Sequence, residues 1–167
     1  MNFNPALRSA LYMPASNNRA IEKSRSIPAD AVIFDLEDSV APAAKPLARE
    51  QLQAAFEKGE FGKTTVIRCN AINSAEYLLD LDIVGACKPD AVLLPKVSTV
   101  ECVETFESDS INRGIAGRCN VWYMIETTAG LINLKDIVQT GVASRCKLSG
   151  LVPVSYTHLT LPTILLV

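Results

Sequence analysis

Residues 29–40, which read A-D-A-V-I-F-D-L-E-D-S-V, join a short apolar run to three carboxylates. The unbroken run from Ala31 to Phe34 is typical of a parallel strand that is buried on both faces. Asp35 and Glu37 lie two residues apart, so on a strand they would share a face. Because chemistry in α/β folds collects at the carboxyl ends of strands, this end, with Asp38, predicts a site for cations, substrate or donors. A merely acidic loop that caps the next helix is the alternative.

The same alternation of an apolar, β-branched run and a helical pattern continues along the chain. Strand starts recur about every 22 to 34 residues, which is the rhythm of βα units. In the helix expected over residues 75–86, the inward side chains are expected to be Leu78, Leu79 and Ile83. Two architectures fit: an open doubly wound sheet, or a (β/α)8 barrel cut short, since a full barrel needs about 250 residues. Strands are expected over residues 8–13, 31–34, 64–69, 90–94, 120–125 and 146–152.

Composition narrows the class of protein. The net charge of -2 argues against nucleic acid or an anionic membrane surface as a partner. No apolar run reaches the roughly 18 residues that a membrane span needs, and the N-terminus does not read as a secretory signal. The five cysteines are scattered without a C-x-x-C pair, which argues against zinc and for reduced thiols, so we expect a cytoplasmic protein.

The βα pattern stops after Val152. Residues 154–163 read V-S-Y-T-H-L-T-L-P-T and resemble the translation of a transposon-type sequencing adapter joined in frame to a gene fragment. A native terminal strand is the alternative. We expect residues 153–167 to be a non-native tail, in which case His158, the single histidine, carries no function.

Five motifs in order carry a resemblance to a known family. They are R-S-A-L-Y-M-P, D-A-V-I-F-D-L-E-D-S-V-A-P followed by Lys45 and Arg49, V-I-R-C-N, P-D-A-V-L-L-P-K, and M-I-E-T. Together they resemble the citrate lyase β-subunit-like family of the HpcH/HpaI aldolase superfamily, in particular its malyl-CoA and citramalyl-CoA lyases. The resemblance implies a TIM barrel, assembled as trimers or hexamers. It favours an α/β (β/α)8 barrel truncated after about the sixth strand, with residues 1–152 forming the partial barrel.

The resemblance also implies a reaction. It is a Mg²⁺-dependent carbon-carbon cleavage of a 3-hydroxyacyl-CoA thioester into an acyl-CoA and a 2-oxo acid. Glu126 matches the family's metal-ligand Glu in M-I-E-T, whereas a lone Glu there could simply begin a helix. The family's second metal-ligand Asp lies further downstream, and nothing in this chain matches it. The fragment itself is therefore expected to be inactive.

Further site residues follow from the same motifs. Arg68 matches the family's substrate-binding Arg, and a guanidinium can hold a carboxylate through two parallel hydrogen bonds. Asp35, Glu37 and Asp38 match D-L-E-D, and we expect them to orient Arg68 and metal-bound waters. A purely structural pairing of Arg68 with Asp35 or Glu37 can coexist with this role.

Three basic residues are candidates for contact with CoA. Arg19 and Lys23 match basic positions that meet CoA phosphates in the family, although an exposed helix face explains them equally well. Lys96 either neutralises the carboxylates or lies near CoA. Two other functions stay open: a citrate lyase β-subunit acting on a carrier-protein-linked citryl thioester, and a non-enzymatic open-sheet α/β binding module.

Overall fold

One parallel sheet organises the chain, and each of its strands pairs with the next strand along the sequence. The structure, a computed structural model, describes residues 7–153. Its strands are β1 (Ala10–Pro14), β2 (Ala31–Asp35), β3 (Thr64–Arg68), β4 (Ala91–Leu94), β5 (Asn120–Ile125) and β6 (Leu148–Pro153). The expected strands are therefore all present, with ends that differ by at most two residues.

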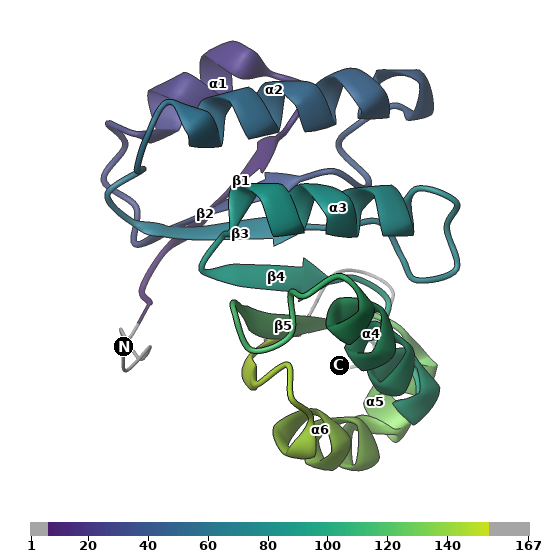
Figure 1. Cartoon of the computed structure of the whole chain (residues 1–167). Coiled ribbons are helices and arrows are strands. Elements are labelled where there is room, and N and C mark those ends of the chain that lie inside the picture. The colour runs from purple at the N-terminus through teal and green to yellow at the C-terminus, as the bar shows by residue number, and fades with distance from the viewer. Residues whose placement is uncertain (1–6, 154–167) are drawn as a thin grey trace, which may run out of the picture.

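Helices connect the strands (Figure 1). They are α1 (Asn18–Ser24), the 3-10 helix η1 (Pro42–Ala44), α2 (Lys45–Glu57), α3 (Tyr77–Cys87), α4 (Val100–Asn112), α5 (Thr128–Ile132) and α6 (Leu134–Ala143). Among residues 7–153, no helix combines the length and the apolar character that crossing a membrane requires.

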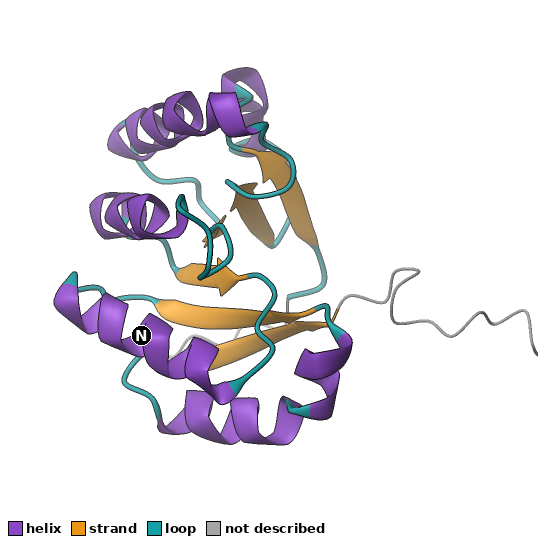
Figure 2. Cartoon of the chain, turned by 90° about the vertical axis from the view of Figure 1, so that its right-hand side faces the viewer, coloured by secondary structure: helices purple, strands orange, loops and turns teal. Residues whose placement is uncertain are grey.

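The strand order decides between the two predicted architectures. A doubly wound sheet reverses its strand order and places helices on both faces, whereas the order here is β1-β2-β3-β4-β5-β6. Figure 2 shows the helices along one side of a curling sheet, as right-handed crossovers in a consecutive order require. The prediction of an α/β barrel truncated after about the sixth strand is confirmed, and the open doubly wound sheet is wrong. The predicted tail over residues 153–167 lies, except for Pro153, outside the described residues.

Both faces of the sheet are apolar. The outward side chains form the larger core with the helices, and the inward face carries a second buried cluster. Ile33 belongs to the inward cluster, and its neighbours Val32 and Phe34 belong to the outward core. This double burial explains why β2 reads as an unbroken apolar run. The inward cluster consists of Ile33, Val66, Ala91, Leu93, Trp122 and Met124.

The inward face of α3 differs from the prediction. Leu78 and Leu79 are 43% and 49% exposed, while Asp80 is fully buried. The apolar pattern misled because the helix turns a carboxylate toward the sheet, and Arg49 on α2 neutralises that carboxylate at 2.8 Å. A charged side chain that faces inward does not show in an apolar pattern. Its partner has to be known before the buried face of the helix can be predicted.

Gly141 marks the closest approach of α6 to the sheet. A Cβ atom there would lie 2.7 Å from a ring carbon of Tyr123 and 3.0 Å from Leu148, distances at which neighbouring atoms must move. Gly85 on α3 offers a matched comparison, because a Cβ there would meet only Ile115, at 3.8 Å.

We expect Gly141→Ala to lower the free energy of unfolding by about 1–3 kcal/mol through overpacking. Gly85→Ala should instead raise it by about 0.5–1 kcal/mol, because alanine favours a helix and space is available. Urea unfolding followed by circular dichroism measures both values. Equal effects of the two substitutions would contradict the close packing at Gly141.

Candidate active site

The carboxyl ends of β2 and β3 bring Arg68 together with three carboxylates. The Arg68 guanidinium lies 3.3 Å from Asp35 and 3.1 Å from Asp38, and it also forms an ion pair with Glu37. Asp35 and Arg68 are direct register partners, so both side chains leave the same face of the sheet. The structure thus places the predicted residues Asp35, Glu37, Asp38 and Arg68 in one cluster.

The loop after β2 is wrapped around the carboxylate of Asp35. One oxygen of Asp35 accepts a hydrogen bond from the Glu37 N–H at 2.8 Å, and the other accepts from the Ser39 N–H at 3.1 Å. Short side-chain bonds of this type are why Asp favours turns. The Leu36 N–H donates to the Arg68 carbonyl at 3.0 Å, which extends the ladder beyond the strand. Asp35 therefore shapes the loop and also binds Arg68.

Glu126 lies at the same edge of the sheet, directly after β5. Its Oε1 accepts a hydrogen bond from the main-chain N–H of Lys96 at 2.8 Å. The Lys96 Nζ donates to Glu37 Oε1 at 2.7 Å, so Lys96, two residues after the end of β4, connects Glu126 with the acidic loop. Of the two roles left open for Lys96, the structure shows the neutralisation of carboxylates.

The start of α5 holds Glu126 in place. Thr127 caps this helix, and its hydroxyl oxygen accepts a hydrogen bond from the Gly130 N–H at 3.0 Å. A Cβ atom on Gly130 would lie 2.5 Å from the Val97 carbonyl, so α5 packs directly on the β4–α4 loop. The two loops that carry Glu126 and Lys96 are thereby fixed against each other.

Arg68 is the centre of charge in this cluster. Burial alone would lower the pKa of Arg68, but the charges of Asp35, Glu37, Asp38 and Glu126 outweigh it and raise that pKa. Burial raises the pKa of Glu37 even though Lys96 and Arg68 oppose the shift. The Arg68 Nε is buried and meets no acceptor among residues 7–153.

The donor set of this edge suits a hard cation in part. Four carboxylates (Asp35, Glu37, Asp38 and Glu126) face the two cationic side chains of Arg68 and Lys96, so negative charge is in excess. Carboxylate oxygens are the ligands that Mg²⁺ prefers. Within residues 7–153, however, no three acidic, Cys or His side chains converge on one metal position. Glu126 is thus a candidate for a single ligand, and residues 7–153 by themselves do not form a metal site.

Arg19 and Lys23 are not part of this cluster. Both are exposed on α1, the helix that follows the edge strand β1. The structure does not bring them to Arg68 or Glu126, and an exposed helix face accounts for them. Their contact with CoA phosphates stays a prediction.

A buried polar network lies behind the acidic loop, and the sequence reasoning missed it. The Lys45 Nζ donates to the Leu36 carbonyl at 2.9 Å, to the Glu37 carbonyl at 3.1 Å, and to Asn70 Oδ1. Asn70 Nδ2 donates to the same Leu36 carbonyl at 2.9 Å. Lys45 and Asn70 thus hold the main chain of the loop through its carbonyl groups.

Asp80 anchors this network. Its Oδ2 accepts from the main-chain N–H and the side-chain amide of Asn70, at 2.6 and 2.7 Å, and its Oδ1 accepts from Arg49 Nε at 2.8 Å. Burial is the largest influence and raises the pKa of Asp80. Lys45 and Arg49, spaced four apart after the acidic loop, were the available signal, because that spacing puts both on one helix face.

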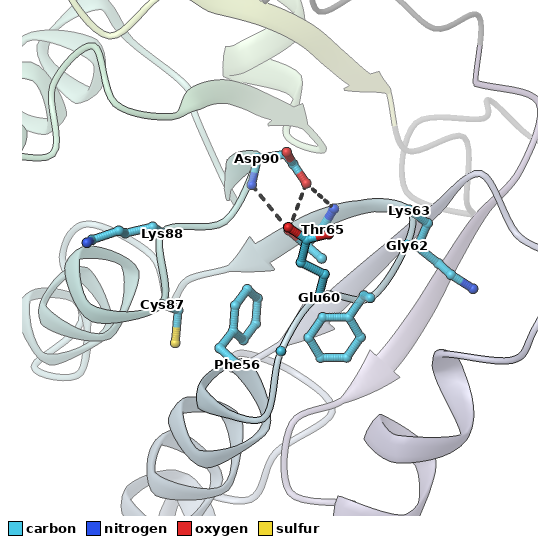
Figure 3. A pocket seen from close by; sticks show the side chains of 10 residues that line it. Phe56, Glu60, Gly62, Lys63, Thr65, Cys87, Lys88 and Asp90 are labelled. Atoms are coloured by element: carbon cyan, nitrogen blue, oxygen red, sulfur yellow. Dashed lines mark hydrogen bonds between the residues drawn. The ribbon is translucent and has the colours of Figure 1, made fainter.

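Two hollows of about 500 Å³ each lie at opposite ends of the strands. One opens beside Glu37 and Lys96 at the carboxyl edge. The other lies at the amino edge, where Asp90 accepts from the N–H and the hydroxyl of Thr65 at 2.8 and 2.9 Å (Figure 3). Lys88 points away from Asp90 in this view. These hydrogen bonds of Asp90 hold the start of β4 against β3, which is a structural role.

Six consecutive parallel strands with helices on one side, and a buried Arg and four carboxylates at the strand ends, define an α/β barrel-type protein with a charged site at those ends. The model of the HpcH/HpaI aldolase/citrate lyase family matches residues 8–151, and the chain belongs to this family.

Curated relatives and a solved structure agree with the family. The chain is 36% identical over 146 residues to a (3S)-malyl-CoA thioesterase of Cereibacter sphaeroides, covering 87% of this chain and 47% of the relative. It is 31% identical over 140 residues to the mitochondrial citramalyl-CoA lyase of Rattus norvegicus, covering 79% and 41%. The citrate lyase β subunit of M. tuberculosis, solved with oxaloacetate and magnesium, superposes with a TM-score of 0.72 at 27% identity, covering 92% and 60%. The chain spans less than half the length of these two curated relatives.

The raised pKa of Glu37 predicts a pH-dependent stability. Between the usual value of 4.5 and the raised pKa, the folded protein binds more protons than the unfolded chain, so Glu37 lowers stability as pH rises through this window. Glu37→Gln removes this contribution. We expect the stability of Glu37→Gln relative to wild type to increase with pH above about 4.5 and then to level off. Urea unfolding of both proteins across this range measures the difference, and a difference that falls with pH would contradict the burial of Glu37.

Proposed function

We propose that the whole protein is a Mg²⁺-dependent carbon-carbon lyase that cleaves a 3-hydroxyacyl-CoA of the malyl-CoA or citramalyl-CoA type. The products are an acyl-CoA and a 2-oxo acid. The observation that carries this proposal is the position of the buried Arg68 guanidinium and the Glu126 carboxylate at one edge of the sheet. The names of the relatives, a malyl-CoA thioesterase and a citramalyl-CoA lyase, support a CoA thioester as substrate.

Arg68 is the residue that would bind the carboxylate of the oxo-acid half. A guanidinium fixes the position and the plane of a carboxylate through two parallel hydrogen bonds. Of its present partners, Asp35 and Glu37 are buried, whereas the side chain of Asp38 is 63% exposed. A substrate carboxylate would therefore replace Asp38 at the lowest cost, while Asp35 and Glu37 keep the guanidinium oriented.

Glu126 is the residue that would hold Mg²⁺, and the solved relative from M. tuberculosis contains magnesium together with oxaloacetate. The ion would polarise the oxygens of the oxo acid and stabilise negative charge as the bond breaks. Further ligands would come from the substrate, from water and from residues outside 7–153, because Mg²⁺ keeps several non-protein ligands.

The reaction places definite demands on these residues. The bond between C2 and C3 of the acyl chain breaks, the C3 hydroxyl loses its proton and becomes the oxo group, and the electron pair moves onto C2 as a thioester enolate. Protonation of C2 then gives the acyl-CoA. Arg68 keeps the departing oxo acid in one orientation throughout, and fixed orientation is a large source of rate acceleration.

Two other reactions use the same site. Hydrolysis of the thioester is supported by the relative that is named a malyl-CoA thioesterase. Cleavage of a citryl thioester on a carrier protein is supported by the superposition on a citrate lyase β subunit. For all three, we propose small-molecule or carrier-linked thioester partners, a cytoplasmic location and a trimeric or hexameric whole protein, with neither nucleic acid nor membrane as a partner.

Product analysis separates these reactions. We expect the full-length protein to convert (3S)-malyl-CoA into glyoxylate and acetyl-CoA, with glyoxylate measured as its phenylhydrazone and free CoA thiol measured in parallel. EDTA should abolish turnover. Glu126→Gln should reduce it by roughly 100-fold or more, because the substitution removes a charged metal ligand. Glu104→Gln, the same change on the exposed face of α4, is the matched control and should leave turnover unchanged.

Each alternative gives a different outcome. Free CoA and malate without glyoxylate would identify a thioesterase, and inactivity on every CoA ester with turnover of citryl carrier protein would identify a citrate lyase subunit. Full activity of Glu126→Gln would remove Glu126 from the cation site. The 167-residue chain alone is expected to show no turnover.

A further inference from the structure

Lys96 has an unusual main-chain conformation at the carboxyl edge of the sheet. Its φ of 55° lies in the left-handed region, which side chains other than glycine rarely adopt. Lys88 and Lys147 share this conformation, but the Lys88 N–H ends α3 in the ordinary way, by donating to the Val84 carbonyl. The Lys96 N–H donates instead to the side chain of Glu126, thirty residues away.

The side chain of Lys96 serves a different partner. Its Nζ lies 2.7 Å from Glu37 Oε1 and 3.9 Å from Asp38 Oδ1. Glu37 is only 6% exposed, and its second oxygen pairs with Arg68. The ammonium thus compensates a carboxylate that burial would otherwise destabilise. Glycine would accept the left-handed conformation without strain but could not supply this charge.

We propose that Lys96 is a positioning residue for Glu126. Its main-chain N–H, in the strained left-handed conformation, orients the Glu126 carboxylate, while its ammonium keeps Glu37 paired with Arg68. The effect of Lys96 on cation binding rests on the proposed function, because Glu126 is the residue proposed to hold the cation. A hydrogen bond from the main chain restricts the carboxylate rotation without competing for both oxygens. Such partners of metal ligands commonly change metal affinity by 10–100-fold when they are lost.

The alternative is an ordinary ion pair between Lys96 and Glu37 with no effect on Glu126. Two substitutions distinguish the positioning role from this ordinary ion pair, because both remove the ammonium and only one suits the left-handed conformation. Lys96→Gly keeps the N–H in place and relieves the strain. Lys96→Val disfavours φ near 55° because its side chain is β-branched, and it should displace the N–H. Lys96→Arg keeps both the strain and the positive charge.

The first measurement is the amide proton shift of residue 96 in the 167-residue chain at pH 7. A hydrogen bond to a carboxylate moves this resonance downfield. We expect Glu126→Ala to remove the downfield shift in wild type, in Lys96→Arg and in Lys96→Gly, but to have little effect in Lys96→Val. An unchanged resonance in wild type on Glu126→Ala would overturn the proposal, whatever the activity of the protein.

The second measurement is the Mn²⁺ affinity of the full-length protein, followed by electron paramagnetic resonance, with Mn²⁺ as the probe for a hard divalent cation. We expect Lys96→Val to bind Mn²⁺ at least about tenfold more weakly than Lys96→Gly. Equal affinities would overturn the positioning role. If wild type bound no Mn²⁺, the proposed function would lose its cation site, and the amide shift would still decide the role of Lys96. Circular dichroism verifies that each variant is folded.

Discussion

The pairing of Arg68 with carboxylates is the interaction on which the geometry of this edge depends. Asp35, Glu37 and Asp38 leave one strand end within a few residues, and their mutual repulsion would open the loop without a shared cation. A guanidinium suits this task better than an ammonium, because its fork contacts several carboxylates at once. Removing one partner of a buried pair of this kind typically costs about 3–5 kcal/mol, so these charges are held in place by one another.

The same loop is held from behind by a second set of buried polar groups. Lys45 and Asn70 bind the carbonyls of Leu36 and Glu37, and Asp80 with Arg49 fixes Asn70. Buried charges seldom add net stability compared with apolar side chains of the same size. Their arrangement here does something that apolar side chains cannot, since hydrogen bonds fix the direction of a main chain. The acidic loop is thus a rigid support for Arg68 between two polar layers.

The sequence was informative where a signal is local. Apolar runs predict all six strands, and the period of two predicts that Asp35 and Glu37 point the same way, which their shared contact with Arg68 agrees with. It failed at α3, where Leu78 and Leu79 face outward because Asp80 turns inward to Arg49, thirty-one residues away. The conformation of Lys96 was also beyond prediction, because a positive φ at lysine arises from its tertiary partners. Structural features that depend on residues near in sequence were predictable, and features that depend on partners distant in sequence were not.

The position of the site within the sheet explains how much of it this chain can build. Glu37 follows β2, Arg68 is the last residue of β3, and Glu126 follows β5; each of these strands pairs on both sides within the described residues. Their relative geometry is therefore set by main-chain hydrogen bonding to a neighbouring strand on each side. The edge strands are different: Tyr12 on β1 and Leu151 on β6 are each 42% exposed. Arg19 and Lys23 belong to the unit of such an edge strand. The relative positions of Arg68, Glu37 and Glu126 thus depend on the central strands alone, whereas the further cation ligands and the CoA contacts that we propose would depend on what surrounds the edge strands.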